Sequence, residues 1–112
     1  SHYTRAIAAI DRDLQRLVAA ADTNPAYRDR TVFVVVPDCG RDANPLLSVP
    51  FQHHFNSRSA HEIWALVFGP GITRGRVLDK RVDQSSIAAT IGAIMGFDAG
   101  RAEGRVLDEI LL

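Results

Sequence analysis

The chain contains little of several features that mark special classes of protein. Cys39 is the single cysteine among 112 residues, so an internal disulfide is excluded. The longest apolar runs, at 32–37 and 63–68, fall far short of the roughly 20 residues that a membrane-spanning helix needs. We therefore predict that no segment spans a membrane and that no disulfide scaffold holds the fold.

An excess of charge of either sign is also absent. Thirteen basic residues balance thirteen acidic ones, and every basic residue except Lys80 is an arginine. These arginines are scattered, whereas a nucleic-acid binder concentrates them on one face or in one run, so we expect no nucleic-acid partner. With 46% hydrophobic and 23% charged residues, the composition is typical of one globular domain, residues 1–112, or of a part of one.

Two segments have the pattern of amphipathic helices. Residues 4–21 carry apolar side chains at three- and four-residue spacing, with charged side chains between them. The second segment begins at Ser85 or Ser86, either of which can cap a helix, and Gly96 marks its end. The apolar positions are Ile7, Ile10, Leu14, Leu17, Val18 and Ala21 in the first segment and Ile87, Ile91, Ile94 and Met95 in the second.

Two other segments, 31–36 and 63–68, are predicted to be strands. Both are almost uniformly apolar, which is typical of strands buried on both faces of a parallel sheet. The polar turn at 37–42 ends the first strand, at the edge where open α/β sheets bind their ligands. Residues 43–61 have little periodicity and predict a long loop, and 74–82 alternate weakly, as in a short edge strand or hairpin arm. The predicted class is α/β with a largely parallel sheet.

These elements leave apolar surface without partners. Two strands that are apolar throughout need helices on both faces and neighbouring strands, but the sequence offers two helices and a C-terminal tail, 103–112. We therefore expect the chain to pair with another polypeptide, including a second copy, or to form part of a larger domain. We also expect the tail to pack, since it ends in Ile110, Leu111 and Leu112.

Metal-binding side chains gather around the end of the first strand. Asp38 follows that strand, and His53 and His54 lie on the next loop; carboxylate oxygen and neutral imidazole both bind zinc and manganese. The alternatives are a turn residue for Asp38 and ordinary hydrogen-bonded or solvated loop residues for the two histidines. Cys39 is either a thiolate ligand beside Asp38 or a small buried thiol.

Arg41 is a candidate for binding an anion such as phosphate, with backbone N–H groups of the same turn beside it. The alternative is a surface ion pair with Asp42. His61 precedes the second strand and is expected to be a packing or surface residue. The sequence contains neither the G-x-S-x-G turn of serine hydrolases nor a phosphate-binding glycine loop.

Taken together, these segments resemble the C-terminal portion of the alkaline phosphatase superfamily of metal-dependent phosphatases, sulfatases, phosphodiesterases and phosphomutases. The likeness covers nearly the whole chain, and the order and spacing of its segments carry it more than any single motif. The segments are the helix from Tyr3 through Leu14, the strand and turn at 31–41, Gln52-His53-His54, the strand and turn at 62–72, the helical segment 82–97, and 103–107.

The resemblance implies part of a three-layer α/β/α fold and a set of metal ligands. Asp38 matches a metal-binding aspartate whose successor in the family is a histidine, a position that Cys39 occupies here. His54, or else His53, matches a late ligand histidine, and His2 corresponds to a histidine before the helix. His61 matches no ligand position.

The function implied is that of the C-terminal part of a metal-dependent hydrolase of phosphate or sulfate esters, with a small anionic ester as substrate. The divalent metal would be zinc, with manganese as the alternative. The family's nucleophile belongs to an N-terminal half outside these residues, so we expect the chain alone to be inactive. The competing hypothesis is a catalytically silent module of the same family with an interaction or structural role, which the replacement of histidine by Cys39 favours.

Overall fold

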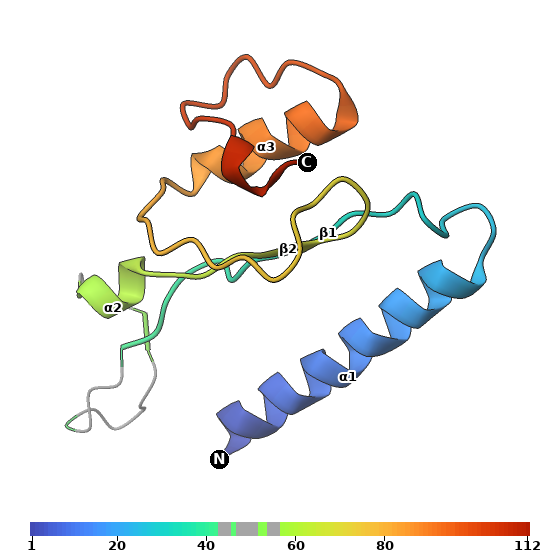
Figure 1. Cartoon of the computed structure of the whole chain (residues 1–112). Helices are drawn as coiled ribbons and strands as arrows, with labels where there is room; N and C mark the ends of the chain where they lie inside the picture. Colours follow the sequence, from blue (N-terminus) through green and yellow to red (C-terminus); the bar gives the residue numbers. More distant parts are fainter. Residues whose placement is uncertain (43–45, 47–51, 54–56) are drawn as a thin grey trace. The chain divides into compact units, whose positions relative to one another are not determined.

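The computed structural model describes residues 1–42, 46, 52–53 and 57–112 (Figure 1). The chain divides into two compact units, Ser1–Pro70 and Gly71–Leu112, which we call unit 1 and unit 2. Unit 1 contains α1 (His2–Thr23), β1 (Phe33–Val35), α2 (Arg58–His61) and β2 (Leu66–Phe68), and unit 2 contains α3 (Ser85–Met95) and the 3-10 helix η1 (Asp108–Ile110).

Helix α1 confirms the predicted amphipathic helix and extends it slightly at both ends. At its start the Ser1 hydroxyl accepts a hydrogen bond from the Thr4 N–H, and the Thr4 hydroxyl accepts one from the N-terminal amino group of Ser1, so two donors at the start of the helix are satisfied. At its end Asn24 adopts an extended conformation, as expected of a residue before proline. No residue of α1 is fully buried, and Ile10 is 65% exposed.

The sheet of unit 1 corrects the predicted fold class. Strands β1 and β2 pair antiparallel, with Phe33 opposite Phe68 and Val35 opposite Leu66. In the described part of the chain this two-stranded sheet is accompanied by no parallel strand, so the predicted three-layer α/β/α fold with a largely parallel sheet is wrong there. The stacked rings of Phe33 and Phe68, with centroids 5.0 Å apart, fix the register on one face.

The physical reason lies in the connection between the strands. A parallel pair needs a crossover of a dozen or more residues, usually a helix, whereas an antiparallel pair needs only a reversal of the chain. Here the chain reverses early, because Asp42 and Gln52 form an antiparallel bridge beyond β1. A continuous apolar run indicates burial but carries no information on strand direction.

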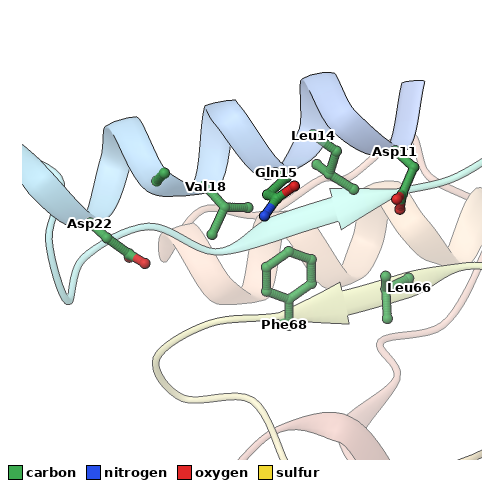
Figure 2. A pocket seen from close by; sticks show the side chains of 8 residues that line it. Asp11, Leu14, Gln15, Val18, Asp22, Leu66 and Phe68 are labelled. Carbon is green, nitrogen blue, oxygen red and sulfur yellow. The ribbon is translucent and has the colours of Figure 1, made fainter. Parts of the chain in front are cut away.

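Helix α1 and strand β2 line a groove of about 630 Å³ within unit 1 (Figure 2). Leu14 and Val18 of α1 and Leu66 and Phe68 of β2 form its apolar wall. Polar side chains of α1 also line it, namely Asp11, Gln15 and Asp22. The groove leaves part of the apolar surface of α1 and β2 accessible, and the expectation that these elements need further partners stays a prediction.

Helix α2 lies in the stretch 43–61 that was predicted to be a loop throughout, so that prediction is wrong at 58–61. Ser57 caps α2 by accepting a hydrogen bond from the Ala60 N–H over 3.3 Å, and Ala60 is buried. Such a serine is a recognisable start signal, but a helix this short has no apolar periodicity to reveal it.

In unit 2, α3 confirms the second predicted helix. The Asp83 carboxylate accepts hydrogen bonds from the Ser85 N–H and hydroxyl, over 2.9 and 2.6 Å, and so caps the first turn in place of the predicted serine caps. These hydrogen bonds also lower the pKa of Asp83. At the other end Gly96 has φ 75°, the left-handed conformation in which glycine is favoured. Residues 74–82 form no strand, so the predicted edge strand or hairpin arm is wrong.

A buried polar contact joins α3 to the C-terminal segment of unit 2. The Thr90 hydroxyl donates to the Ser86 carbonyl over 2.7 Å and accepts from the Leu107 N–H over 3.0 Å, and all three residues are buried. Gly104 passes so close to Ser86 that a Cβ on it would lie 2.5 Å from the Ser86 Cα. The absence of a side chain at position 104 therefore permits this approach.

The C-terminal tail packs as predicted except at its last residue. Ile72 and Leu111 form an antiparallel bridge, and the Thr73 N–H donates to the Ile110 carbonyl over 2.8 Å. Ile110 and Leu111 are half-buried, which confirms the prediction for them. Leu112 is held through its N–H, which donates to the Gly71 carbonyl, but its side chain is 89% exposed, so the prediction is wrong there.

Candidate functional site

The candidate metal-binding and anion-binding residues lie in the turn that follows β1. Pro37 ends the extended segment, and a bend carries the chain through Asp38 and Cys39. Asp38 is exposed and Cys39 is half-buried.

Asp38 and Cys39 interact directly. The Asp38 Oδ1 atom accepts a hydrogen bond from the Cys39 N–H over 2.9 Å and lies 3.6 Å from the Cys39 Sγ, whose thiol donates to it. The backbone hydrogen bond lowers the pKa of Asp38 most, the thiol adds to this effect, and the nearby positive charge of Arg41 lowers the pKa further. The Asp38 side chain is therefore a carboxylate at neutral pH.

Gly40 holds the turn against helix α2. Its N–H donates to the Ala60 carbonyl over 2.8 Å. A Cβ at position 40 would meet the Ser59 carbonyl and would lie 2.8 Å from the Glu62 carbonyl, so backbone approaches backbone here as only glycine allows. Through this contact α2 fixes the position of the turn that carries Asp38 and Cys39.

A second backbone contact brings the histidine segment back to the turn. The Asp42 N–H donates to the Gln52 carbonyl over 2.7 Å, and His53 follows Gln52 directly. Arg41 and His53 are both exposed and flank the bridged residues. The bridge therefore places Gln52 and His53 beside the end of the segment that carries Arg41.

His54 lies outside the described residues, so its role as a metal ligand stays a prediction. His2 is exposed in the first turn of α1, and His61 is the exposed last residue of α2, which agrees with the surface alternative of its two predicted roles. Within the described ranges, no three side chains among His, Cys, Asp and Glu form a metal-binding group.

The donor chemistry of Asp38 and Cys39 fits zinc. A carboxylate oxygen and a thiolate sulfur are both common zinc ligands, whereas manganese prefers oxygen and magnesium rarely accepts sulfur. Two side chains do not complete a zinc site, which takes at least three protein ligands. Any complete site requires a donor beyond this pair.

Sequence reasoning missed the two backbone contacts that shape the site, between Gly40 and Ala60 and between Asp42 and Gln52. The glycine after Asp38-Cys39 was readable as part of a turn, but its partner is not visible in a sequence.

In the part of the chain that the structure describes, no helix combines the length and apolarity that crossing a membrane requires. No protein-family model matches the chain, and no curated protein or solved structure matches it significantly.

Proposed function

We propose that the chain is the C-terminal part of a metal-dependent hydrolase of phosphate or sulfate esters, to which it supplies metal ligands. The nucleophile would come from an N-terminal part outside these residues. One observation carries the proposal: the turn after β1 presents an ionised Asp38 beside the Cys39 thiol, with the Arg41 guanidinium close enough to lower the pKa of Asp38. The sequence resemblance to metal-dependent ester hydrolases supports the same assignment.

We assign metal binding to the Asp38 carboxylate and its neighbouring donors, and anion binding to Arg41. The Asp38 carboxylate, with Cys39 and His54 or His53, would hold a divalent metal, zinc first and manganese second. Arg41, exposed and one residue beyond Gly40, would bind the oxygens of the anionic ester, for which a planar guanidinium is suited. When bound, the metal would supply Lewis-acid stabilisation of charge on the ester and on its leaving oxygen.

The backbone contacts of the turn explain how it could keep its shape around a charged ligand. The Gly40–Ala60 and Asp42–Gln52 hydrogen bonds bracket Arg41, so the position of its Cα is fixed on both sides while its side chain extends into solvent. Preorganisation of this kind reduces the entropy lost when an anion binds.

The test uses the full protein that contains this chain, assayed on a phosphate monoester, a phosphodiester and a sulfate ester. Asp38→Ala should remove bound metal and lower kcat/KM by more than the roughly 10- to 100-fold that loss of an outer-shell partner costs. Arg41→Ala should raise KM while leaving the metal in place. His61→Ala is the matched control, because it removes an imidazole that is outside the proposed site.

The silent module predicted as the alternative is favoured by one observation, the cysteine at position 39 where the resemblance expects histidine. Metal analysis separates the two functions. About two equivalents of zinc or manganese per chain, as in two-metal hydrolases, would support the enzyme. A purified full protein that neither contains nor takes up divalent metal would exclude the enzyme and support the silent module.

A further inference from the structure

Residues 74–82 lead into helix α3 of unit 2 and form no helix or strand (Figure 1). Every residue of this segment except Leu78 is exposed, and the side chain of Val77 is 90% exposed. Within the described part of the chain, residues 76–79 make no backbone–backbone hydrogen bond. A segment of this kind can take up the extended conformation that an endoprotease requires of its substrate without loss of packing.

The same segment carries the single pair of adjacent basic residues in the sequence, Lys80 and Arg81. Both residues are exposed. The Lys80 Nζ atom lies 4.0 Å from the Glu109 carboxylate, but the Lys80 side chain is 68% exposed, so this ion pair is weak and leaves the ammonium group accessible. Endoproteases with acidic specificity pockets select lysine and arginine before the scissile bond. The pair therefore distinguishes this segment from the isolated arginines elsewhere in the chain.

The residues on both sides of the pair are anchored to the C-terminal segment of unit 2. On one side Ile72 is buried and forms an antiparallel bridge with Leu111. On the other side α3 is joined to the Leu107 N–H through the Thr90 hydroxyl. A break in the chain between these two anchors removes neither contact, so the two pieces of unit 2 should stay together.

We propose that the Arg81–Val82 bond is a processing site for an endoprotease specific for paired basic residues, and that cleavage there converts unit 2 to a two-chain form that keeps its fold. One water molecule is added across the peptide bond, so Arg81 gains a terminal carboxylate and Val82 a terminal amino group. No reactant other than water is consumed. Both new charges are solvated, because Arg81 and Val82 are exposed.

The experiment incubates the full protein with a subtilisin-like endoprotease that cleaves after Lys-Arg and identifies the new termini by mass spectrometry. The wild type should be cut between Arg81 and Val82, and the two fragments should elute together in gel filtration until denaturant is added. Arg81→Gln and Lys80→Gln should each abolish this cut. Trypsin requires one basic residue, so it should still produce the Val82 terminus from Lys80→Gln. Arg30→Gln, which removes an exposed arginine of unit 1, is the matched control and should be cut as the wild type is.

Three outcomes would overturn the inference. If the wild type is cut only after denaturation, the pair is not accessible in the folded protein. If the first cut falls elsewhere, or if the paired-basic endoprotease cuts Lys80→Gln as fast as the wild type, the pair does not direct cleavage. If the fragments separate without denaturant, the anchors at Ile72 and Thr90 do not hold a two-chain form together. None of these results depends on the proposed hydrolase function, which the metal analysis tests separately.

Discussion

Unit 2 and unit 1 are stabilised in different ways. In unit 2 the buried Thr90 hydroxyl bonds to two backbone groups and Gly104 passes directly against Ser86, so a few tight contacts determine how α3 and the C-terminal segment fit. In unit 1 the helix α1 buries no residue fully, and the Asp38 turn lies in a loop held by backbone hydrogen bonds. Substitutions at the buried contacts of unit 2 should therefore lower the free energy of unfolding. Substitutions at exposed positions of unit 1 should leave it nearly unchanged, and substitutions in the turn at Asp38 should affect the proposed metal and anion binding.

The largest effect is expected from Gly104→Ala in unit 2. The new Cβ would overlap the backbone of Ser85 and Ser86, and neither backbone can move without disturbing the first turn of α3. We expect a loss of about 3 kcal/mol or more, at the upper end of overpacking costs, measured by urea unfolding. Gly100→Ala is the matched control, since the nearest atom to its Cβ would be 3.5 Å away, on the Asp98 side chain. If Gly104→Ala and Gly100→Ala have equal unfolding free energies, the close approach of Gly104 to Ser86 is contradicted.

The next effect is expected from Thr90→Val, which keeps the shape of the side chain but removes its hydroxyl. The buried Leu107 N–H would lose its acceptor, which should cost about 1–3 kcal/mol of unfolding free energy. Thr90→Ser retains the hydroxyl and should lose less. If valine and serine destabilise the protein equally, the hydrogen bond is not what joins these two segments.

A smaller, pH-dependent effect is expected at Glu109, also in unit 2. Its carboxylate pairs with Arg105 at 2.6 Å and lies 4.0 Å from Lys80, and the Arg105 hydrogen bonds lower the pKa of Glu109 to about 2 from the usual 4.5. Because the folded pKa is depressed, the stabilisation is fully present above pH 4.5 and is lost as the pH falls toward 2. Glu109→Gln should therefore flatten the fall of Tm between these two pH values.

The control for this pair is Glu103→Gln, which removes an exposed carboxylate from the same unit and should leave the pH dependence steep. A Glu109→Gln profile as steep as that of the wild type would show that the ion pair does not contribute to the acid sensitivity of unit 2.

The smallest effect is expected in unit 1, from Ile10→Ser on the exposed face of α1. Ile10 is 65% exposed, and serine and isoleucine have similar helix propensities, so the unfolding free energy should change by less than about 0.5 kcal/mol. Leu14→Ser, at a half-buried position that lines the groove, should cost more. A loss above about 1 kcal/mol for Ile10→Ser would mean that this face is covered, for example by a second copy of the chain, and a concentration-dependent Tm would then identify that copy.

Much of the local structure could be predicted, because it depends on signals a few residues apart. The spacing of Ile7, Ile10 and Leu14 predicted α1, and Gly96 predicted the end of α3. The polar turn after the first apolar strand predicted where Asp38 and Cys39 lie. The predicted metal-ligand set needs a third donor, and how distant segments meet determines which side chain supplies it.

The sequence by itself determined helices α1 and α3, the two apolar strand segments and the adjacency of Asp38 and Cys39, since helix periodicity, capping and neighbouring positions in the chain act over one or two turns. Only the tertiary structure decided that β1 and β2 run antiparallel, that Gly40 packs against Ala60, and that Thr90 accepts from Leu107. Each of these contacts involves at least one backbone group that every residue type carries, so side-chain identity alone does not encode the partner. Strand direction is likewise absent from the side-chain pattern, because an apolar run is compatible with either direction and the path of the connecting chain decides which way the strand runs.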